Sequence, residues 1–159
     1  MKAVILEKFG GPENLKSTEL PDPVPEPGEV LLRVRACALN HLDLFVRDGI
    51  PAYKIALPHI LGCDVAGEVA ALGPGVTAVK AGQRMAVSPG RSCLRCDACL
   101  AGKDNDCRQY GIIGAQGGPG GYAELLCVPE ACLLPIPDAL SFEEAAAYPL
   151  TFLTAWHML

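Results

Sequence analysis

The sequence predicts a mainly β protein with a barrel-like core, to which a small cysteine-rich lobe and a few short helices are attached. Two observations support this prediction. Short runs of β-branched and aliphatic residues alternate along the chain with turns rich in Gly and Pro, such as "ALGPGVTA" (71–78). In addition, "SCLRCDACLAGKDNDC" (92–107) places four of the eight cysteines within one short segment. Many short strands at this spacing are typical of a barrel.

The strands are predicted from short apolar segments bounded by turn residues. The first, "MKAVILEK" (1–8), is followed by "ELPDPVPEPGEV" (19–30), in which alternating prolines impose an extended path without hydrogen-bond donors. The next strand is "VLLRVRACAL" (30–39). Further strands are expected at 64–72, 83–89 and 122–129.

Three helical segments are predicted. Asn40 is a plausible N-cap for a helix that begins at residue 41 and ends at Gly49. Ser141 and Glu144 have the spacing of a capping box for a second helix, which Pro149 interrupts. The third segment, "LTFLTAWHML" (150–159), is apolar nearly all round and is therefore expected to be buried on every side. We accordingly expect the chain to be the front part of a longer protein.

Two glycine patterns, at 73–78 and 118–123, fit the text G-x-G-x-x-A. A dinucleotide fingerprint must follow a strand and open a helix, and neither segment is predicted to do so. We interpret these glycines as turn residues and predict no cofactor-binding residues in the chain.

Charge and hydropathy exclude several classes of protein. The formal net charge of −5 argues against nucleic acid, whose partners usually carry a basic patch. Charged residues, Pro or Gly interrupt every apolar run before it could span a membrane, and the first run, which ends at Leu6, is too short for a signal peptide. We expect a cytoplasmic protein with reduced cysteines.

The cysteine spacing C-x2-C-x2-C-x7-C favours a metal over the alternatives. Disulfides are not expected in the cytoplasm. A bacterial ferredoxin cluster requires a final C-x3-C-P step that is missing here. A structural zinc ion requires four soft ligands in a tetrahedral arrangement, and short C-x2-C turns joined by a loop supply them. A chance run of idle cysteines is the remaining alternative. We predict one structural zinc ion per chain, with the ligands Cys93, Cys96, Cys99 and Cys107.

The order of four segments resembles a known family. "GCDVAGEVAALGPGVTAVKAGQRM" (62–85), the four-cysteine lobe, "GGYAELLCVP" (120–129) and "AAAYPLTFLTAWHML" (145–159) are similar to the N-terminal, GroES-like catalytic domain of zinc-type medium-chain alcohol dehydrogenases. The resemblance implies a GroES-like β-barrel over residues 1–128, with a zinc lobe at 91–108. It also implies that 129–159 is a connector with helices, leading to a Rossmann domain that these 159 residues lack.

The best-known family members hold a second, catalytic zinc ion, and the matching positions differ here. Asn40 stands three residues before Asp43, and Cys63 and Asp64 occupy the family's "GHE" positions. We therefore expect no catalytic zinc, with His41 and His59 as the alternative ligands if one binds. Cys37 is expected on the strand face opposite Asn40 unless the strand bends.

The segment "LNHLDLFVRDG" (39–49) is similar to the quinone-reductase branch of the family, which lacks catalytic zinc. In that branch the Asn region lines the nicotinamide pocket. The resemblance implies that the catalytic residues are Asn40, Asp43, Cys63 and Asp64. Asn40 could equally serve only as a helix cap.

We expect the chain to be the catalytic-domain part of an NAD(P)-dependent oxidoreductase. The full-length enzyme would bind NAD(P) and transfer a hydride to or from an alcohol or carbonyl, a quinone or an enone, and the 159 residues alone would be inactive. The partners expected are a small-molecule substrate, with no nucleic acid and no membrane, and a homo-oligomer is left open. The alternative is a free-standing, zinc-stabilised binding module without activity.

Overall fold

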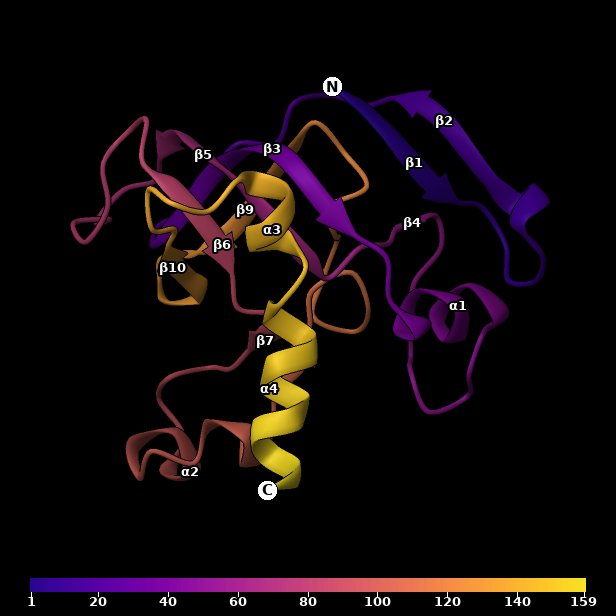
Figure 1. Ribbon diagram of the computed structural model, residues 1–159. Coiled ribbons are helices and arrows are strands. Elements are labelled where there is room, and N and C mark those ends of the chain that lie inside the picture. Colours follow the sequence, from indigo (N-terminus) through magenta and orange to yellow (C-terminus); the bar gives the residue numbers. More distant parts are fainter.

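The computed structural model describes residues 1–159 and is built mainly from short strands (Figure 1). The strands are β1 (Lys2–Leu6), β2 (Leu15–Glu19), β3 (Glu29–Ala38), β4 (His59–Ile60), β5 (Asp64–Leu72), β6 (Arg84–Val87), β7 (Gly90–Arg91), β8 (Gly111–Ile112), β9 (Leu125–Pro129) and β10 (Leu133–Pro135). The α-helices are α1 (His41–Asp48), α2 (Asp97–Leu100), α3 (Phe142–Ala146) and α4 (Pro149–Met158), and single 3-10 turns lie at Pro12–Asn14, Asp104–Asp106 and Glu130–Cys132.

The strands form three antiparallel sheets. The largest has the order β10-β6-β5-β3-β9, the second has the order β2-β1-β4, and β7 pairs with β8 in the third. No parallel strand pair occurs among residues 1–159. The mainly β prediction is confirmed, and the chain contains no βαβ unit that could hold a dinucleotide.

The main core lies against the five-stranded sheet. Along β3, Val30 and Leu32 are fully buried whereas Arg33 and Arg35 are exposed, because successive side chains of a strand point to opposite faces. The buried members of this core are Val30, Leu32, Val65, Val69, Val79, Met85, Val87, Ile113, Leu126, Val128 and Cys132.

A bulge in β3 changes the direction of its last residues. The register with β5 shifts between Val34 and Ala36, after which Cys37 pairs with Val65. Such a shift bends the strand and re-aims its side chains. The Cys37 sulfur faces Gly62, since a Cβ atom built on that glycine would lie 2.7 Å from the sulfur. The strand therefore bends, and Cys37 lies beside the segment that carries Cys63.

The sequence predicted the start of α3 and both ends of α1 correctly, whereas α3 ends at Ala146 and Pro149 begins α4 instead of interrupting α3. Asn40 and Asp43 form a capping box at the start of α1, and Gly49 ends the helix in the left-handed conformation with φ 84°. Ser141 and Glu144 form the predicted capping box of α3. The Ala145 and Ala146 side chains of α3 pack in a second buried cluster on the five-stranded sheet.

Part of the segment 129–159, predicted to be a connector, joins the barrel. β10 adds an edge strand beside β6, and α3 packs on β3, β5 and β6. The domain boundary at residue 128 stays a prediction. The two G-x-G-x-x-A patterns lie in turns, where Gly75 and Gly118 have φ values of 82° and 113°.

Helix α4 begins at Pro149, the first-turn position that proline favours, and extends away from the sheet (Figure 1). Phe152 is 71% exposed and Trp156 is 79% exposed. The prediction that this helix is buried on every side is wrong for these residues, because no other element of the 159 residues covers that face. None of the helices combines the length and the hydropathy that a membrane span requires.

Candidate metal centre and candidate active site

Along the chain the cysteine-rich lobe connects β7 to β8, and its helix α2 lies apart from the five-stranded sheet (Figure 1). Its turn at Leu94 has φ 56°, a left-handed conformation that is uncommon for a side chain of this size. Cys96 is the N-cap of the single-turn helix α2, which also carries Cys99. This local folding directs the side chains from the two ends of the lobe toward one another.

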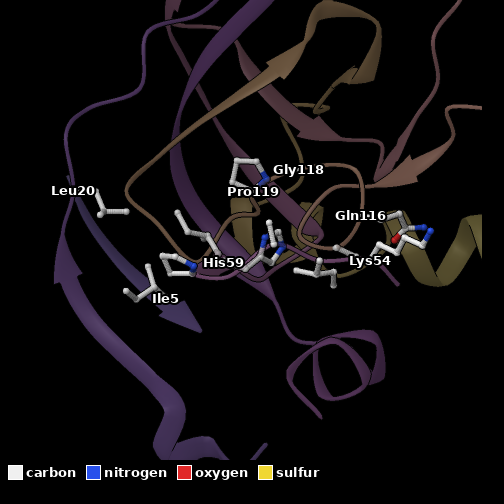
Figure 2. Close-up of a pocket in the computed structure, with 12 residues that line it drawn as sticks. Ile5, Leu20, Lys54, His59, Gln116, Gly118 and Pro119 are labelled. Atoms are coloured by element: carbon white, nitrogen blue, oxygen red, sulfur yellow. The ribbon is translucent and has the colours of Figure 1, made fainter. Parts of the chain in front are cut away.

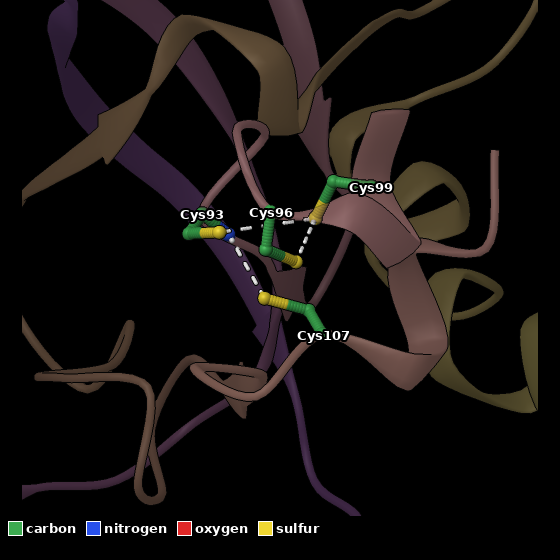
Figure 3. A group of neighbouring side chains, drawn as sticks. All are labelled: Cys93, Cys96, Cys99 and Cys107. Carbon is green, nitrogen blue, oxygen red and sulfur yellow. Dashed lines mark hydrogen bonds between the residues drawn. The ribbon is translucent and has the colours of Figure 1, made fainter. Parts of the chain in front are cut away.

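The four predicted ligands form one compact group (Figure 3). Their sulfur atoms all lie within 4.8 Å of one another. The Cys96 and Cys99 sulfurs are 3.5 Å apart, and those of Cys93 and Cys99 are 3.9 Å apart. Zn–S bonds of about 2.3 Å in a tetrahedron place the sulfur atoms about 3.8 Å apart, so the donor set fits zinc.

Backbone hydrogen bonds favour the thiolate form of part of this group. The backbone N–H groups of Cys93 and Gln109 both donate to the Cys107 sulfur at 3.3 Å. A hydrogen bond from the Arg95 backbone is the main reason that the pKa of Cys93 falls to about 6. Desolvation raises the pKa of Cys99 to about 11. A divalent cation binds cysteine as the thiolate, so its binding would release the protons that remain on the four sulfurs.

A second cluster contains the four residues predicted to be catalytic. The Asn40 side-chain Nδ2 donates to Asp64 Oδ2 at 2.9 Å and to the Cys63 sulfur at 3.6 Å. Asp43 accepts from the Asn40 backbone N–H at 2.8 Å and from the Gly62 backbone N–H at 3.0 Å. The start of α1 is thereby joined to the segment that leads into β5.

Most of the polar groups in this cluster are buried. Asp64 and Cys63 are each 1% exposed, and Asp43 is 5% exposed. The second carboxylate oxygen of Asp64 accepts from the Leu150 backbone N–H of α4 at 2.8 Å. Burial raises the pKa of Asp64, although the hydrogen bonds from Asn40 and Leu150 act in the opposite direction.

The Cys63 thiol of this cluster and the Cys37 thiol beside it are neutral. Burial, with a smaller contribution from the Asp43 and Asp64 charges, raises the pKa of Cys37 to about 12. Burial also raises the pKa of Cys63, and the adjacent Asp64 charge adds to this effect. A thiol is a nucleophile only as the thiolate, so neither residue is activated for attack.

Closely packed glycines hold the backbone of this cluster in place. A Cβ atom on Gly120 would lie 2.3 Å from the Gly62 carbonyl oxygen and 2.4 Å from the Leu61 carbonyl oxygen. A Cβ atom on Gly114 would lie 2.7 Å from the Gly62 carbonyl carbon. Three chain segments therefore meet with no room for a side chain, which fixes the position of Cys63.

Sequence reasoning missed Tyr122, although it faces the same cluster. A Cβ atom on Gly62 would lie 2.6 Å from the Tyr122 ring, and the Tyr122 hydroxyl is buried without a hydrogen-bond partner. Burial and then the Asp43 charge raise the pKa of Tyr122, so the phenol stays neutral. The sequence placed Tyr122 only at the start of a predicted strand, which gave no sign of this contact.

The two histidines considered as rescue ligands do not join a metal-binding group. His41 is exposed on α1, with its ring centroid 6.3 Å from that of Phe45. His59 lies in β4 opposite Leu6, and burial lowers its pKa. Three or more His, Cys, Asp or Glu side chains could share a metal ion only if they lie close together. Among the 159 residues, the four-cysteine group is the one set that does. The absence of a catalytic zinc ion stays a prediction.

The structure also has a cavity of about 510 Å³, which both residues of β4 help to line. Figure 2 shows His59 in its middle, between Ile5 and Leu20 at one end and Lys54 and Gln116 at the other. None of the four residues predicted to be catalytic lines this cavity.

Comparison with protein families gives one match over most of the chain. Residues 26–138 match the model of the alcohol dehydrogenase GroES-like domain. An alcohol dehydrogenase from Geobacillus stearothermophilus is 40% identical over 147 residues, which are 92% of this chain and 43% of that protein. A quinone oxidoreductase from Mus musculus is 31% identical over 160 residues, or 100% of this chain and 40% of that protein. The chain thus spans less than half the length of these curated relatives.

Solved structures show the same similarity. A crystal structure of an NAD-dependent alcohol dehydrogenase superimposes with a TM-score of 0.95 at 53% sequence identity, covering 99% of this chain and 46% of that chain. The cobalt- and zinc-bound thermostable alcohol dehydrogenase from Pyrobaculum aerophilum superimposes with a TM-score of 0.90 at 40% identity, covering 99% of this chain and 47% of that chain.

Proposed function

Because the chain belongs to the family of alcohol dehydrogenase GroES-like domains, we propose that it is the catalytic-domain part of an NAD(P)-dependent oxidoreductase with a structural zinc site. The single observation that carries this proposal is the family match over residues 26–138, which includes both the cysteine lobe and the Asn40 cluster. The resemblance that the sequence showed is confirmed by this match and by relatives that are alcohol dehydrogenases and quinone oxidoreductases.

The four lobe cysteines would hold the zinc ion. Four thiolates fill a tetrahedral site and leave no open position for substrate, so the ion would stabilise the lobe rather than act in catalysis. The sulfur separations of 3.5 and 3.9 Å support this assignment.

The reaction proposed is hydride transfer between NAD(P)(H) and a small-molecule substrate. The cofactor supplies the hydride chemistry when it is bound, and the protein supplies position and electrostatics. In this chain the Asn40 cluster would form the substrate-side wall, and the neutral Cys63 thiol would contribute shape without adding charge. The cofactor would be held by further sequence of a longer protein, since all strand pairs here are antiparallel.

A conjugated carbonyl, a quinone or an enone is the substrate class that these residues favour. A catalytic zinc ion normally takes three protein ligands. Around Cys63, no three His, Cys, Asp or Glu side chains lie close enough together to bind one ion. Conjugated acceptors need less stabilisation of a developing alkoxide than simple alcohols do.

The zinc assignment is tested by elemental analysis of the purified chain. We expect a zinc-to-protein ratio near one, and the Cys99→Ser variant should lose most of this zinc. The matched control is Cys127→Ser, which alters a cysteine outside the lobe and should keep the ratio unchanged. Iron in place of zinc, or a ratio near two with the second ion lost on Cys63→Ser, would contradict the proposal.

The oxidoreductase assignment is tested with a chimera. Residues 1–159 replace the matching part of the Geobacillus stearothermophilus alcohol dehydrogenase, which supplies the rest of a longer protein. We expect the chimera to bind NADH or NADPH and to oxidise it with a quinone, an enone or an aldehyde, and the chain alone to do neither. A chimera that contains zinc and binds cofactor but turns over none of these substrates would favour the binding-module alternative.

A further inference from the structure

Asp64 occupies a position that suits a structural connection better than acid–base chemistry. Both of its carboxylate oxygens accept hydrogen bonds, Oδ1 from the Leu150 backbone N–H at 2.8 Å and Oδ2 from the Asn40 side-chain amide at 2.9 Å. The residue is 1% exposed. Burial and a donor of this chain on each oxygen keep a substrate from direct contact with the carboxylate in this structure, although sequence reasoning placed Asp64 among the catalytic residues.

The Leu150 N–H is one of the orphan donors at the start of α4. The first N–H groups of a helix have no partner within the helix, and Pro149 before it has no N–H at all. Asp64 therefore takes the place of an N-cap side chain from a distant part of the sequence. Its negative charge also suits the positive end of the helix dipole.

The same carboxylate also holds the side-chain amide of Asn40. One of its N–H groups points to Asp64 and another to the Cys63 sulfur, while Asp43 holds the Asn40 backbone N–H. Rotation of the Asn40 side chain would break its bond to Asp64. The orientation of the amide therefore depends on where the Asp64 carboxylate lies.

We propose that Asp64 is a positioning residue that couples the first turn of helix α4 to the orientation of the Asn40 amide. This inference rests on the proposed function in that Asn40 is a candidate active-site residue. Contacts along the exposed length of α4, where Phe152 and Trp156 lie, would reach the site through two consecutive hydrogen bonds.

The two hydrogen bonds that Asp64 accepts determine which substitutions test the coupling. Both partners of Asp64 are N–H donors, so the position needs two acceptor oxygens. Asp64→Asn offers one acceptor and one donor, and one of the two bonds must be lost. The double variant Asn40→Asp with Asp64→Asn restores both bonds, since the amide introduced at position 64 donates to the new carboxylate and still accepts from Leu150.

The experiment measures amide hydrogen exchange and side-chain amide resonances by NMR on the 159-residue chain. Asp64→Asn must lose at least one of the two hydrogen bonds. Loss of the bond to Leu150 should raise the exchange rate of the Leu150 amide about tenfold or more. Loss of the bond to Asn40 should shift the Asn40 side-chain resonances. The double variant should return the Leu150 rate close to that of the parent. Asp138→Asn, which alters an exposed aspartate, is the matched control and should change neither readout.

Two results would overturn the coupling. The Phe152 amide donates within α4 to the Tyr148 carbonyl, so equal acceleration of Leu150 and Phe152 would mean that Asp64→Asn only loosens the helix. Leu150→Pro removes the donor without altering Asp64 or Asn40, and unchanged Asn40 resonances in that variant would show that α4 does not act on the amide. None of these readouts needs turnover, so an inactive chimera would refute the proposed function and leave the coupling intact.

Discussion

Cys37 and Cys63 show how burial decides what a reactive side chain can do. Both lie beside two aspartates and away from any fixed positive charge, and burial is the main cause of their raised pKa values. Reactive cysteines are found in the opposite surroundings, partly exposed and electropositive. Cys63 therefore contributes volume and a weak hydrogen-bond acceptor to the candidate site.

We predict that Cys37 resists alkylation in the folded chain. A rise in pKa from 9.0 to about 12 lowers the thiolate fraction at pH 8 by about a thousandfold, and the rate of reaction with iodoacetamide falls with it. Peptide mass spectrometry after timed alkylation measures this rate, with the urea-unfolded chain as the control. Rapid modification of Cys37 without loss of structure would contradict the assignment of a buried, neutral thiol.

Gly120 shows the importance of space for the backbone around the candidate site. We predict that Gly120→Ala lowers the free energy of unfolding by about 3 kcal/mol, because its Cβ atom would overlap two carbonyl oxygens of the 61–62 segment. The control is Gly28→Ala, where φ is 80° but nothing lies within 4 Å, and where the left-handed backbone alone should cost about 1 kcal/mol. Equal losses in urea denaturation of the two variants would show that the close approach is unimportant.

At the scale of elements, the ends of the helices are set by local chemistry and their positions by distant contacts. Helix α3 begins at a capping box in which Glu144 N–H donates to the Ser141 hydroxyl at 3.1 Å and Ser141 N–H donates to Glu144 at 2.8 Å. Helix α4 has no such local cap, and its first turn is held by Asp64 from β5. The residues that cap α3 can be recognised in the local sequence, whereas the contact with Asp64 that holds the first turn of α4 cannot.

We predict that Ser141→Ala destabilises the protein by about 1 kcal/mol, the usual effect of removing an N-cap hydroxyl. Ser17→Ala serves as the control, because Ser17 is exposed in β2 and makes no side-chain hydrogen bond, and its effect should be close to zero. Urea denaturation of both variants at neutral pH provides the comparison. A Ser141→Ala variant as stable as the parent would mean that packing of the α3 alanines alone holds the helix.

At the scale of the whole molecule, the lobe and the barrel are held together by different forces. The barrel has a buried core of aliphatic side chains, whereas α2 has no buried residue and the lobe is joined to the rest through the short strands β7 and β8. A segment with so little buried apolar surface cannot offset its conformational entropy without a cross-link or a metal ion.

We predict that removing zinc with a chelator unfolds the lobe and leaves the barrel intact. Hydrogen exchange followed by mass spectrometry should show loss of protection within residues 91–108, while β3 and β5 remain protected. Adding back one equivalent of zinc should restore the lobe. Loss of protection in both regions together would show that the ion stabilises the entire fold.

The sequence alone determined the features that depend on local chemistry. The four-cysteine spacing predicted the group that the structure assembles, and the capping residues of α1 and α3 predicted both helix starts. The strand at 30–39 was also predicted from local pattern, and its side chains alternate between the two faces of β3 because a side chain's face in a strand follows from its position. The family resemblance came from the order of such segments.

Only the tertiary structure decided what the candidate site is made of. The bulge in β3 turned Cys37 toward Gly62, and the contacts of Tyr122 and Gly120 with that glycine join segments nearly sixty residues apart in sequence. The same is true of Asp64, which the sequence suggested was catalytic and which the fold engages through the Leu150 N–H and the Asn40 amide. Whether a carboxylate is free to react depends on which donors the fold brings to it, and pairings between distant segments leave no periodic signal in the chain.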